Sequence, residues 1–217
     1  MPIIIPPSGS QPQSAYEDDL HRILPYASDC PPSAAIFHLR EAAADFFQRT
    51  LAWREDLPVV LSVVGAQDYT LTLPGMTKIA KLLRYTFDGA EKDVVDAEVG
   101  ERLAIDGSMR EAAWTLDRLG LSINPRPVSA GKVMTVRVAL KPTNTAESLP
   151  EVLHDQYIDH IASGALARIL ALPDAAWSDQ ALADRFEGRF ELAVARVGLM
   201  TSRGFRGTGR RGTAVFF

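Results

Sequence analysis

The segment His-Asp-Gln-Tyr-Ile-Asp-His at 154–160 gathers the residue types that could carry out acid–base catalysis or bind a metal ion. A histidine beside a carboxylate is a usual pair for moving a proton, so one hypothesis is a small hydrolase that uses His154, Asp155, Asp159 and His160. The two histidines are six residues apart, about 600° around a helix, so they point in substantially different directions. They cannot clamp one ion as histidines four residues apart do, and we expect no metal site here.

Other residues that could carry chemistry are isolated in the sequence. Cys30 is the single cysteine, so a disulfide within the chain is impossible and we expect a buried thiol in a reducing compartment. No Gly-x-Gly-x-x-Gly or Walker sequence occurs, and the Gly-rich stretch 204–212 carries arginines in place of the P-loop lysine. Trp53, Trp114 and Trp177 are too dispersed for a base-stacking platform, so we expect them in the core or at an interface. We predict no cofactor and no catalytic residue.

The helices that would position these residues lie at the two ends of the chain. Residues 1–32 contain seven of the 14 prolines, which predicts an irregular N-terminal arm with one short helical turn around 16–24. Apolar residues three and four apart predict an amphipathic helix over 33–50 and a second one from Pro150 to Pro173. A third helix is predicted with Ser178 as its N-cap. Its polar side is expected to be a solvated face, with Asp184, Arg185, Glu187, Arg189, Glu191 and Arg196.

Between residues 57 and 142, short runs of β-branched residues alternate with turn-forming residues, which predicts five or six antiparallel strands. The runs lie at 59–64, 69–73, 79–87, 102–105, 114–123 and 132–140. No helix long enough for a parallel crossover is apparent between them, which argues against a doubly wound sheet.

The expected fold class is therefore α+β: a helical bundle, with one helix before and two after an inserted antiparallel β-sheet or small barrel, plus an N-terminal arm and an extended C-terminal tail. The length of 217 residues suits one such domain over 1–200, followed by a docking tail over 201–217. Within the domain we assign 1–32 to the arm, 33–56 and 143–200 to the helical bundle, and 57–142 to the β-rich insertion.

Charge is segregated along the chain more than the net charge of −4 suggests. Residues 88–117 hold nine acidic and three basic side chains, whereas 118–142 hold five basic ones and no acidic one. Opposite bands of this kind favour self-association or a charged partner, although they also pair readily within one chain. The candidate subunit-interface residues of the basic band are Arg126, Lys132, Arg137 and Lys141. No apolar run reaches the roughly 20 residues of a membrane span, and the N-terminus lacks a signal-peptide pattern, so we expect a soluble, unprocessed protein.

The tail over 201–217 is basic and ends in an apolar tip, Ala-Val-Phe-Phe. A basic linker that carries an apolar anchor favours docking onto another protein, for example by adding a strand to a sheet edge. Nucleic-acid binding through the arginines is an alternative, as is an end without a role. The candidate docking residues are Arg203, Arg206, Arg210, Arg211, Val215, Phe216 and Phe217.

The helical segments resemble the head-to-tail adaptor proteins of tailed phages, of the tail tubular protein A type. The opening part of the resemblance is Cys30-Pro31, Leu39-Arg40-Glu41-Ala42-Ala43-Ala44-Asp45-Phe46-Phe47, Thr50 and Trp53. The later part is Leu149-Pro150, Leu153, the run Ile-Ala-Ser-Gly-Ala-Leu-Ala-Arg-Ile-Leu at 161–170, Pro173, Trp177-Ser178-Asp179, Ala183, Phe186 and Phe190. The parts occur in the family's order, with the β region between them, and cover about 30–200.

The resemblance implies a structural virion protein and not an enzyme. Such a protein is expected to form a ring of twelve subunits between the capsid portal and the tail, assembled in the host cytoplasm. Its implied partners are further copies of itself, the portal protein, the tail nozzle or tail-tube protein, and double-stranded DNA that passes through the channel without sequence-specific binding. The resemblance leaves two other function classes open, the small hydrolase and a nucleic-acid-binding module.

Overall fold

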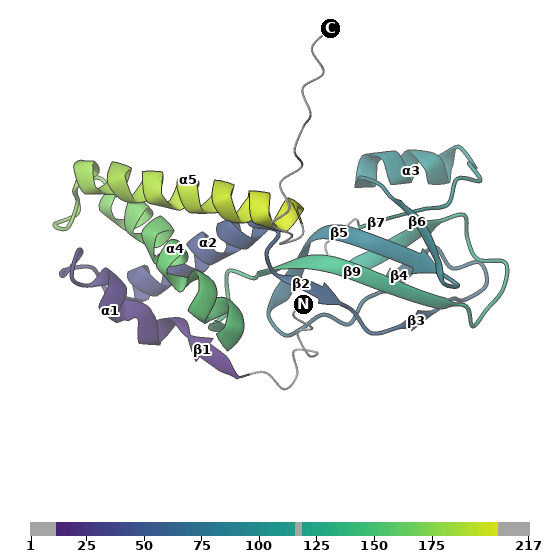
Figure 1. Cartoon of the computed structure of the whole chain (residues 1–217), viewed down its shortest axis with the longest axis horizontal. Coiled ribbons are helices and arrows are strands. Elements are labelled where there is room, and N and C mark those ends of the chain that lie inside the picture. The colour runs from purple at the N-terminus through teal and green to yellow at the C-terminus, as the bar shows by residue number, and fades with distance from the viewer. Residues whose placement is uncertain (1–11, 116–118, 204–217) are drawn as a thin grey trace, which may run out of the picture.

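The structure is a computed structural model that describes residues 12–115 and 119–203. The molecule is elongated, with most of its helices in one region and most of its strands in the other (Figure 1). The helices are η1 (Tyr16–Asp19), α1 (Leu20–Ile23), α2 (Pro32–Thr50), α3 (Ala97–Ile105), α4 (Glu151–Leu170) and α5 (Gln180–Ser202). The strands are β1 (Gln13–Ala15), β2 (Arg54–Asp56), β3 (Val60–Leu61), β4 (Asp68–Thr70), β5 (Thr77–Phe87), β6 (Ala90–Val94), β7 (Ala112–Trp114), β8 (Gly120–Asn124), β9 (Val133–Pro142) and β10 (Ser148–Pro150).

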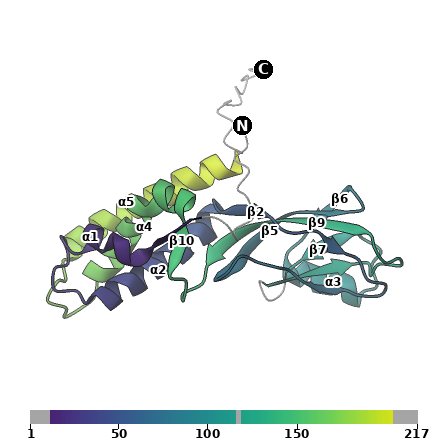
Figure 2. The ribbon, with the colours of Figure 1, turned by 90° about the horizontal axis from the view of Figure 1, so that it is seen from below.

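Helices α2, α4 and α5 form the helical layer, so both ends of the described chain contribute to it (Figure 1). The view in Figure 2 shows η1 and α1 lying along the same layer. α2 has Pro32 in its first turn, where the missing backbone N–H has no helical partner to lose. α5 begins after Asp179, whose carboxylate accepts a hydrogen bond from the Leu182 backbone N–H. The predicted N-cap, Ser178, is wrong by one residue, because its hydroxyl instead donates to the Leu170 carbonyl.

An aromatic cluster fills the centre of the helical layer. The ring of Phe46 lies 5.2 Å from that of Tyr157 and 6.2 Å from that of Phe190, between centroids. The ring of Phe47 lies 5.7 Å from the Trp53 indole, which carries the core toward the sheet. Apolar residues at the helical spacing from which these helices are predicted are buried in this layer: Leu39, Phe46, Ile161, Ile169, Phe186 and Phe190.

Two helix glycines let a helix approach an aromatic ring closely. A Cβ at Gly164 of α4 would lie 2.6 Å from Cδ2 of Phe190 on α5. A Cβ at Gly100 of α3 would lie 2.2 Å from Cδ2 of the Trp114 indole on β7. Each glycine therefore sets the depth at which its helix packs, one in the helical layer and one over the sheet.

The large sheet has the strand order β2-β9-β5-β6-β7-β8-β4, and β3 also pairs with β9. Its longest pair, β5 with β9, is antiparallel and has register shifts between Ile79 and Lys81 and between Leu82 and Arg84. Such irregularities increase local twist, which suits a sheet that curls. β4 is the strand at the far end of this order, and the hydroxyl of its Tyr69 hydrogen-bonds to the backbone of Val63. The loop after β3 is therefore tied to β4.

The expected architecture, a helical bundle with a small inserted antiparallel sheet or barrel, is wrong. The protein is mixed α/β, with 42% helix, 25% strand and a large curled sheet of seven to eight strands. The expectation that no helix crosses between parallel strands is also wrong, since β6 and β7 are parallel and α3 connects them. The segment 102–105, predicted as a strand, is the second half of α3.

The physical reason lies in β6, whose sequence is Ala-Glu-Lys-Asp-Val. Its three charged residues hide the apolar alternation from which strands are predicted, so the sequence does not predict the strand that joins β5 to β7 in the sheet. In the arm, η1 and α1 lie where a short helical turn is predicted, whereas the strand β1 is not predicted. β1 pairs with β10, and η1 and α1 follow directly, with Tyr16 and Ile23 buried.

Candidate functional site

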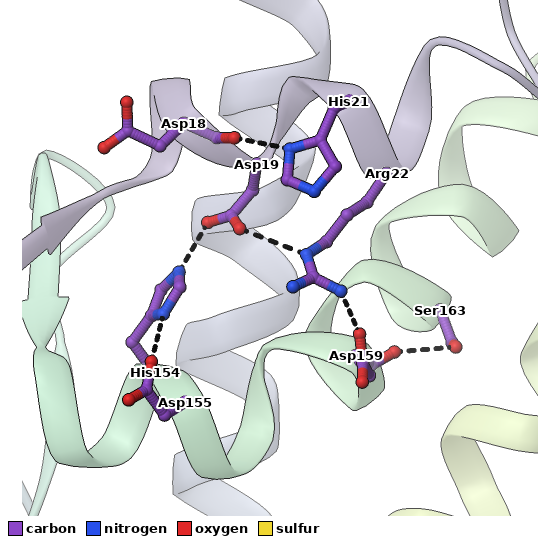
Figure 3. Close-up of polar contacts among 8 residues, drawn as sticks. All are labelled: Asp18, Asp19, His21, Arg22, His154, Asp155, Asp159 and Ser163. Carbon is purple, nitrogen blue, oxygen red and sulfur yellow. Dashed lines mark hydrogen bonds and ion pairs between the residues drawn. The ribbon is translucent and has the colours of Figure 1, made fainter.

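The segment that was a candidate for catalysis occupies the first turns of α4, against η1 and α1 (Figure 3). Asp19, at the end of η1, is 2% exposed. Its Oδ2 lies 2.8 Å from Nε2 of His154, and its Oδ1 accepts a hydrogen bond from Nε of Arg22 at 3.3 Å. Arg22 also pairs with the Asp159 carboxylate. This polar cluster (Asp19, Arg22, His154, Asp159) therefore joins the N-terminal segment to α4.

The geometry of the polar cluster suits a structural contact better than proton transfer to a substrate. Nδ1 of His154 lies 3.4 Å from Oδ1 of Asp155, so both ring nitrogens face carboxylates of the described chain. His160 is not in the cluster, because its ring lies 6.2 Å from the Phe46 ring. The nearby Ser163 hydroxyl donates to the backbone carbonyl of Asp159, as Figure 3 shows. The two histidines point apart, as their spacing predicts.

Asp19 and Arg22 are the members of the polar cluster that the sequence analysis missed. They lie 135 and 137 residues before their partners His154 and Asp159. No motif spacing links positions that far apart, and a short helix after a Pro-rich arm carries no periodicity to point to them. The approach of η1 to α4, set by the β1–β10 pairing, brings them together.

Other places where a ligand could bind are modest. A cavity of about 300 Å³ lies between the sheet and the β1–β10 pair, and Glu147 is the one ionisable side chain among its lining residues. The Cys30 thiol is buried, as predicted, and burial raises its pKa, which lowers the thiolate fraction. Across residues 12–115 and 119–203, no three or more His, Cys, Asp or Glu side chains lie together so as to hold a metal ion.

Arg126, Lys132 and Arg137, all predicted at a subunit interface, contact polar groups of their own chain. Lys132 pairs with Asp88, and Arg137 forms two hydrogen bonds to Asp56. Arg126 donates to the amide oxygen of Gln67. Lys141 lies opposite Lys78 in the β5–β9 register. The basic band thus finds acidic partners within the chain at two positions, and its role between subunits stays a prediction.

Large apolar side chains are exposed on three surfaces. The first is the outer side of α5, with Leu192, Leu199 and Met200 exposed by 72%, 55% and 41%. The second is the outer side of α3 and the turn after it, with Val99, Ile105 and Met109 exposed by 41%, 83% and 80%. The third, the sheet tip, surrounds β3 and the start of β9: Val59, Leu61, Val63, Val64, Val128 and Val133. Apolar side chains gathered in this way are typical of protein-contact surfaces.

Most of the predicted docking tail lies outside the described residues. This holds for Arg206, Arg210, Arg211, Val215, Phe216 and Phe217. Arg203 is described and follows α5 directly, exposed to solvent.

No known protein family and no curated protein matches the chain. None of the helices in the described part of the chain is both long enough and apolar enough to cross a membrane.

Proposed function

We propose that the chain is the subunit of a ring-forming adaptor that joins the portal of a tailed-phage capsid to the tail, with double-stranded DNA passing through the ring. The observation that carries the proposal is the contact between the two separated parts of the resemblance. Phe46 belongs to the opening part and Phe190 to the later part, and their rings lie 6.2 Å apart although the whole large sheet separates them in the sequence. Segments matched in order that also pack together support a shared architecture of the helical layer.

The exposed surfaces support the same proposal. A ring subunit must present one face to the preceding copy and a different face to the following copy. It also needs surfaces for the portal on one side and for the tail nozzle or tail-tube protein on the other. The outer side of α5, the outer side of α3 and the sheet tip are three separate apolar surfaces, which suits a protein with several partners. A virion location follows from this proposal.

The experiment is to mix the full chain with DNA-filled capsids that carry the portal but lack a tail, and to image the portal vertex. We expect a ring of about twelve copies on the portal, as the resemblance implies for this class of adaptor. A chain that never joins the vertex, whatever its own oligomeric state, would contradict the proposed function.

The role of the tail is tested in the same assay with a chain that lacks residues 213–217. The sequence joins a basic segment to an apolar tip, a combination that favours docking onto another protein, so we expect unchanged folding and loss of portal binding. Twelve linked copies would multiply a weak contact into stable attachment, so the loss is expected to be complete at concentrations where the full chain saturates the vertex. If the shortened chain joins the portal normally, the tail is not the docking element.

A further inference from the structure

A row of arginines runs along one side of α5 without an acidic partner. Arg185, Arg189, Arg196 and Arg203 follow one another at intervals of four, seven and seven residues, which places them within about 40° of one another around the helix. None of this arginine ridge pairs with a carboxylate among the described residues, and Arg189 lies over the Phe186 ring. The exposed Leu192 and Leu199 run beside the ridge.

α3 carries the opposite charge with a similar apolar content. Asp96, Glu101 and Asp106 have no cationic partner in the part of the chain that the structure describes. They border the exposed Val99 and Ile105. Gly100 packs on Trp114, so the side of α3 opposite Gly100 is directed away from the sheet. We call the exposed surface that carries Asp96, Glu101 and Asp106 the acidic α3 face.

The two surfaces do not cover each other within one chain. α3 packs on β7 and β8, whereas α5 packs on α4 and α2. In Figure 1 α5 runs along the helical layer to the middle of the molecule and α3 lies over the sheet, and in Figure 2 α3 and the C-terminal part of α5 lie on opposite sides. Within the described residues these two charged surfaces do not neutralise each other, whereas a second copy can bring them together.

We propose that the arginine ridge and leucines of α5 in one copy dock onto the acidic α3 face of the next copy. Opposite charges would set the orientation of the two helices, and burial of the apolar side chains would hold them together. The contact joins two different surfaces, so it is heterologous and closes into a ring when the rotation between copies permits. The inference rests on the proposed function, since it identifies the contact on which the adaptor ring would depend.

A nucleic-acid phosphate backbone is the other occupant that an arginine ridge suits. The exposed leucines favour the protein contact, because contact with phosphate would leave them in water. Nucleic-acid binding by the ridge would also leave the unpaired carboxylates of the acidic α3 face without a role.

The experiment compares four full-length chains by native mass spectrometry and sedimentation: the wild type, the α5 reversal R185E/R189E/R196E, the α3 reversal E101R/D106R, and the chain that carries both reversals. We expect each single reversal to raise the dissociation constant between copies by about 100-fold, since like charges then face each other. The chain with both reversals should associate again. Equimolar mixing of the two single-reversal chains should also restore assembly, because each α5 then meets an α3 of opposite charge in the other chain.

Matched controls are E187R and D184R, which change charge on the other side of α5 and should leave association unchanged. If both single reversals assemble like the wild type, the interface lies elsewhere, although the proposed function still stands through its portal assay. A wild-type chain that stays monomeric at about 100 μM would overturn a contact between copies. Loss of salt-sensitive binding to a DNA duplex in the α5 reversal, with self-association unchanged, would assign the ridge to phosphate and overturn the proposal.

Discussion

The helical layer and the large sheet differ in how completely they bury their apolar side chains. The helical layer meets around a cluster of rings, in which Phe46, Phe47 and Phe190 are at most 1% exposed. In the sheet, several strands are only two to five residues long, and apolar side chains at its tip stay exposed. Because the sheet tip leaves large apolar side chains exposed, we infer that the helical layer carries more of the stability and the sheet more of the contact surface.

Charges follow a different division. Around the sheet, cations pair with nearby carboxylates, as Lys132 does with Asp88 and Lys92 with Glu111. On the helical layer, α5 keeps a row of arginines without such partners among the described residues. The stable region of the molecule thus also displays the charge that a second copy would neutralise.

The largest expected effect comes from emptying the aromatic cluster of the helical layer. Phe190→Ala should lower the free energy of unfolding by about 3 to 5 kcal/mol, because it leaves a cavity between α4, α5 and Phe46. The matched control is Phe37→Ala on α2, whose side chain is 48% exposed, with an expected change within about 0.5 kcal/mol. Urea unfolding measures both. A loss below about 1 kcal/mol for Phe190→Ala would show that the layer does not carry the stability.

The next effect compares the two glycines that sit under aromatic rings. Gly164→Ala crowds Phe190 in the helical layer, and Gly100→Ala crowds Trp114 over the sheet. Overpacking costs about 1 to 3 kcal/mol, and alanine returns up to about 1 kcal/mol in helix propensity, so we expect net losses of about 1 to 2 kcal/mol. Gly188→Ala meets no atom within 4 Å and should stabilise by about 0.5 to 1 kcal/mol.

Hydrogen exchange separates the two variants by region. Gly164→Ala should speed exchange throughout the described helices and strands, whereas Gly100→Ala should speed it only in α3 and strands β6, β7 and β8. Equal acceleration in α2 and α4 for Gly100→Ala would mean that the helical layer and sheet unfold as one unit.

The sequence predicts the helical layer well because its apolar residues recur at helical spacing. The helices at 33–50 and from Pro150 onward appear as α2 and α4, and their buried stripes meet as expected. The sheet is predicted less well, since pairing depends on partners far away in the chain. β9 pairs with β2, β3 and β5, and local pattern gives no sign that β6 and β7 run parallel.

The candidate sites show the same limit. The divergence of His154 and His160 follows from local helix geometry and is correctly predicted. The partners of His154 and Arg137 are not, because Asp19 and Asp56 are 135 and 81 residues away from them. The spacing of the arginines in the ridge is visible in the sequence. It predicts only a solvated face, however, because the sequence does not show which surface could contact the ridge.

The smallest effect comes from one exposed ion pair in each region. Glu191 of α5 pairs with Arg49 of α2, and Asp56 of β2 pairs with Arg137 of β9. The hydrogen bond from each arginine is the main cause that holds the pKa of its carboxyl below the usual range. Stability from a lowered pKa is present above the ordinary pKa and lost as pH falls through the folded pKa, so it should fade from about pH 4 downward.

Glu191→Gln and Asp56→Asn should each cost about 0.2 to 1 kcal/mol near pH 7, and this cost should disappear at pH values low enough to protonate both carboxyls in the folded protein as well as in the unfolded chain. Urea unfolding at several pH values checks the size and the sign for Glu191→Gln, and hydrogen exchange in the sheet checks them for Asp56→Asn. If the helical layer limits global stability, Glu191→Gln should shift the urea midpoint, while Asp56→Asn should alter only local hydrogen exchange in the sheet. Equal midpoint shifts would instead show that the pair between α2 and α5 and the pair between β2 and β9 report on one cooperative unit, which would remove the division between the two regions.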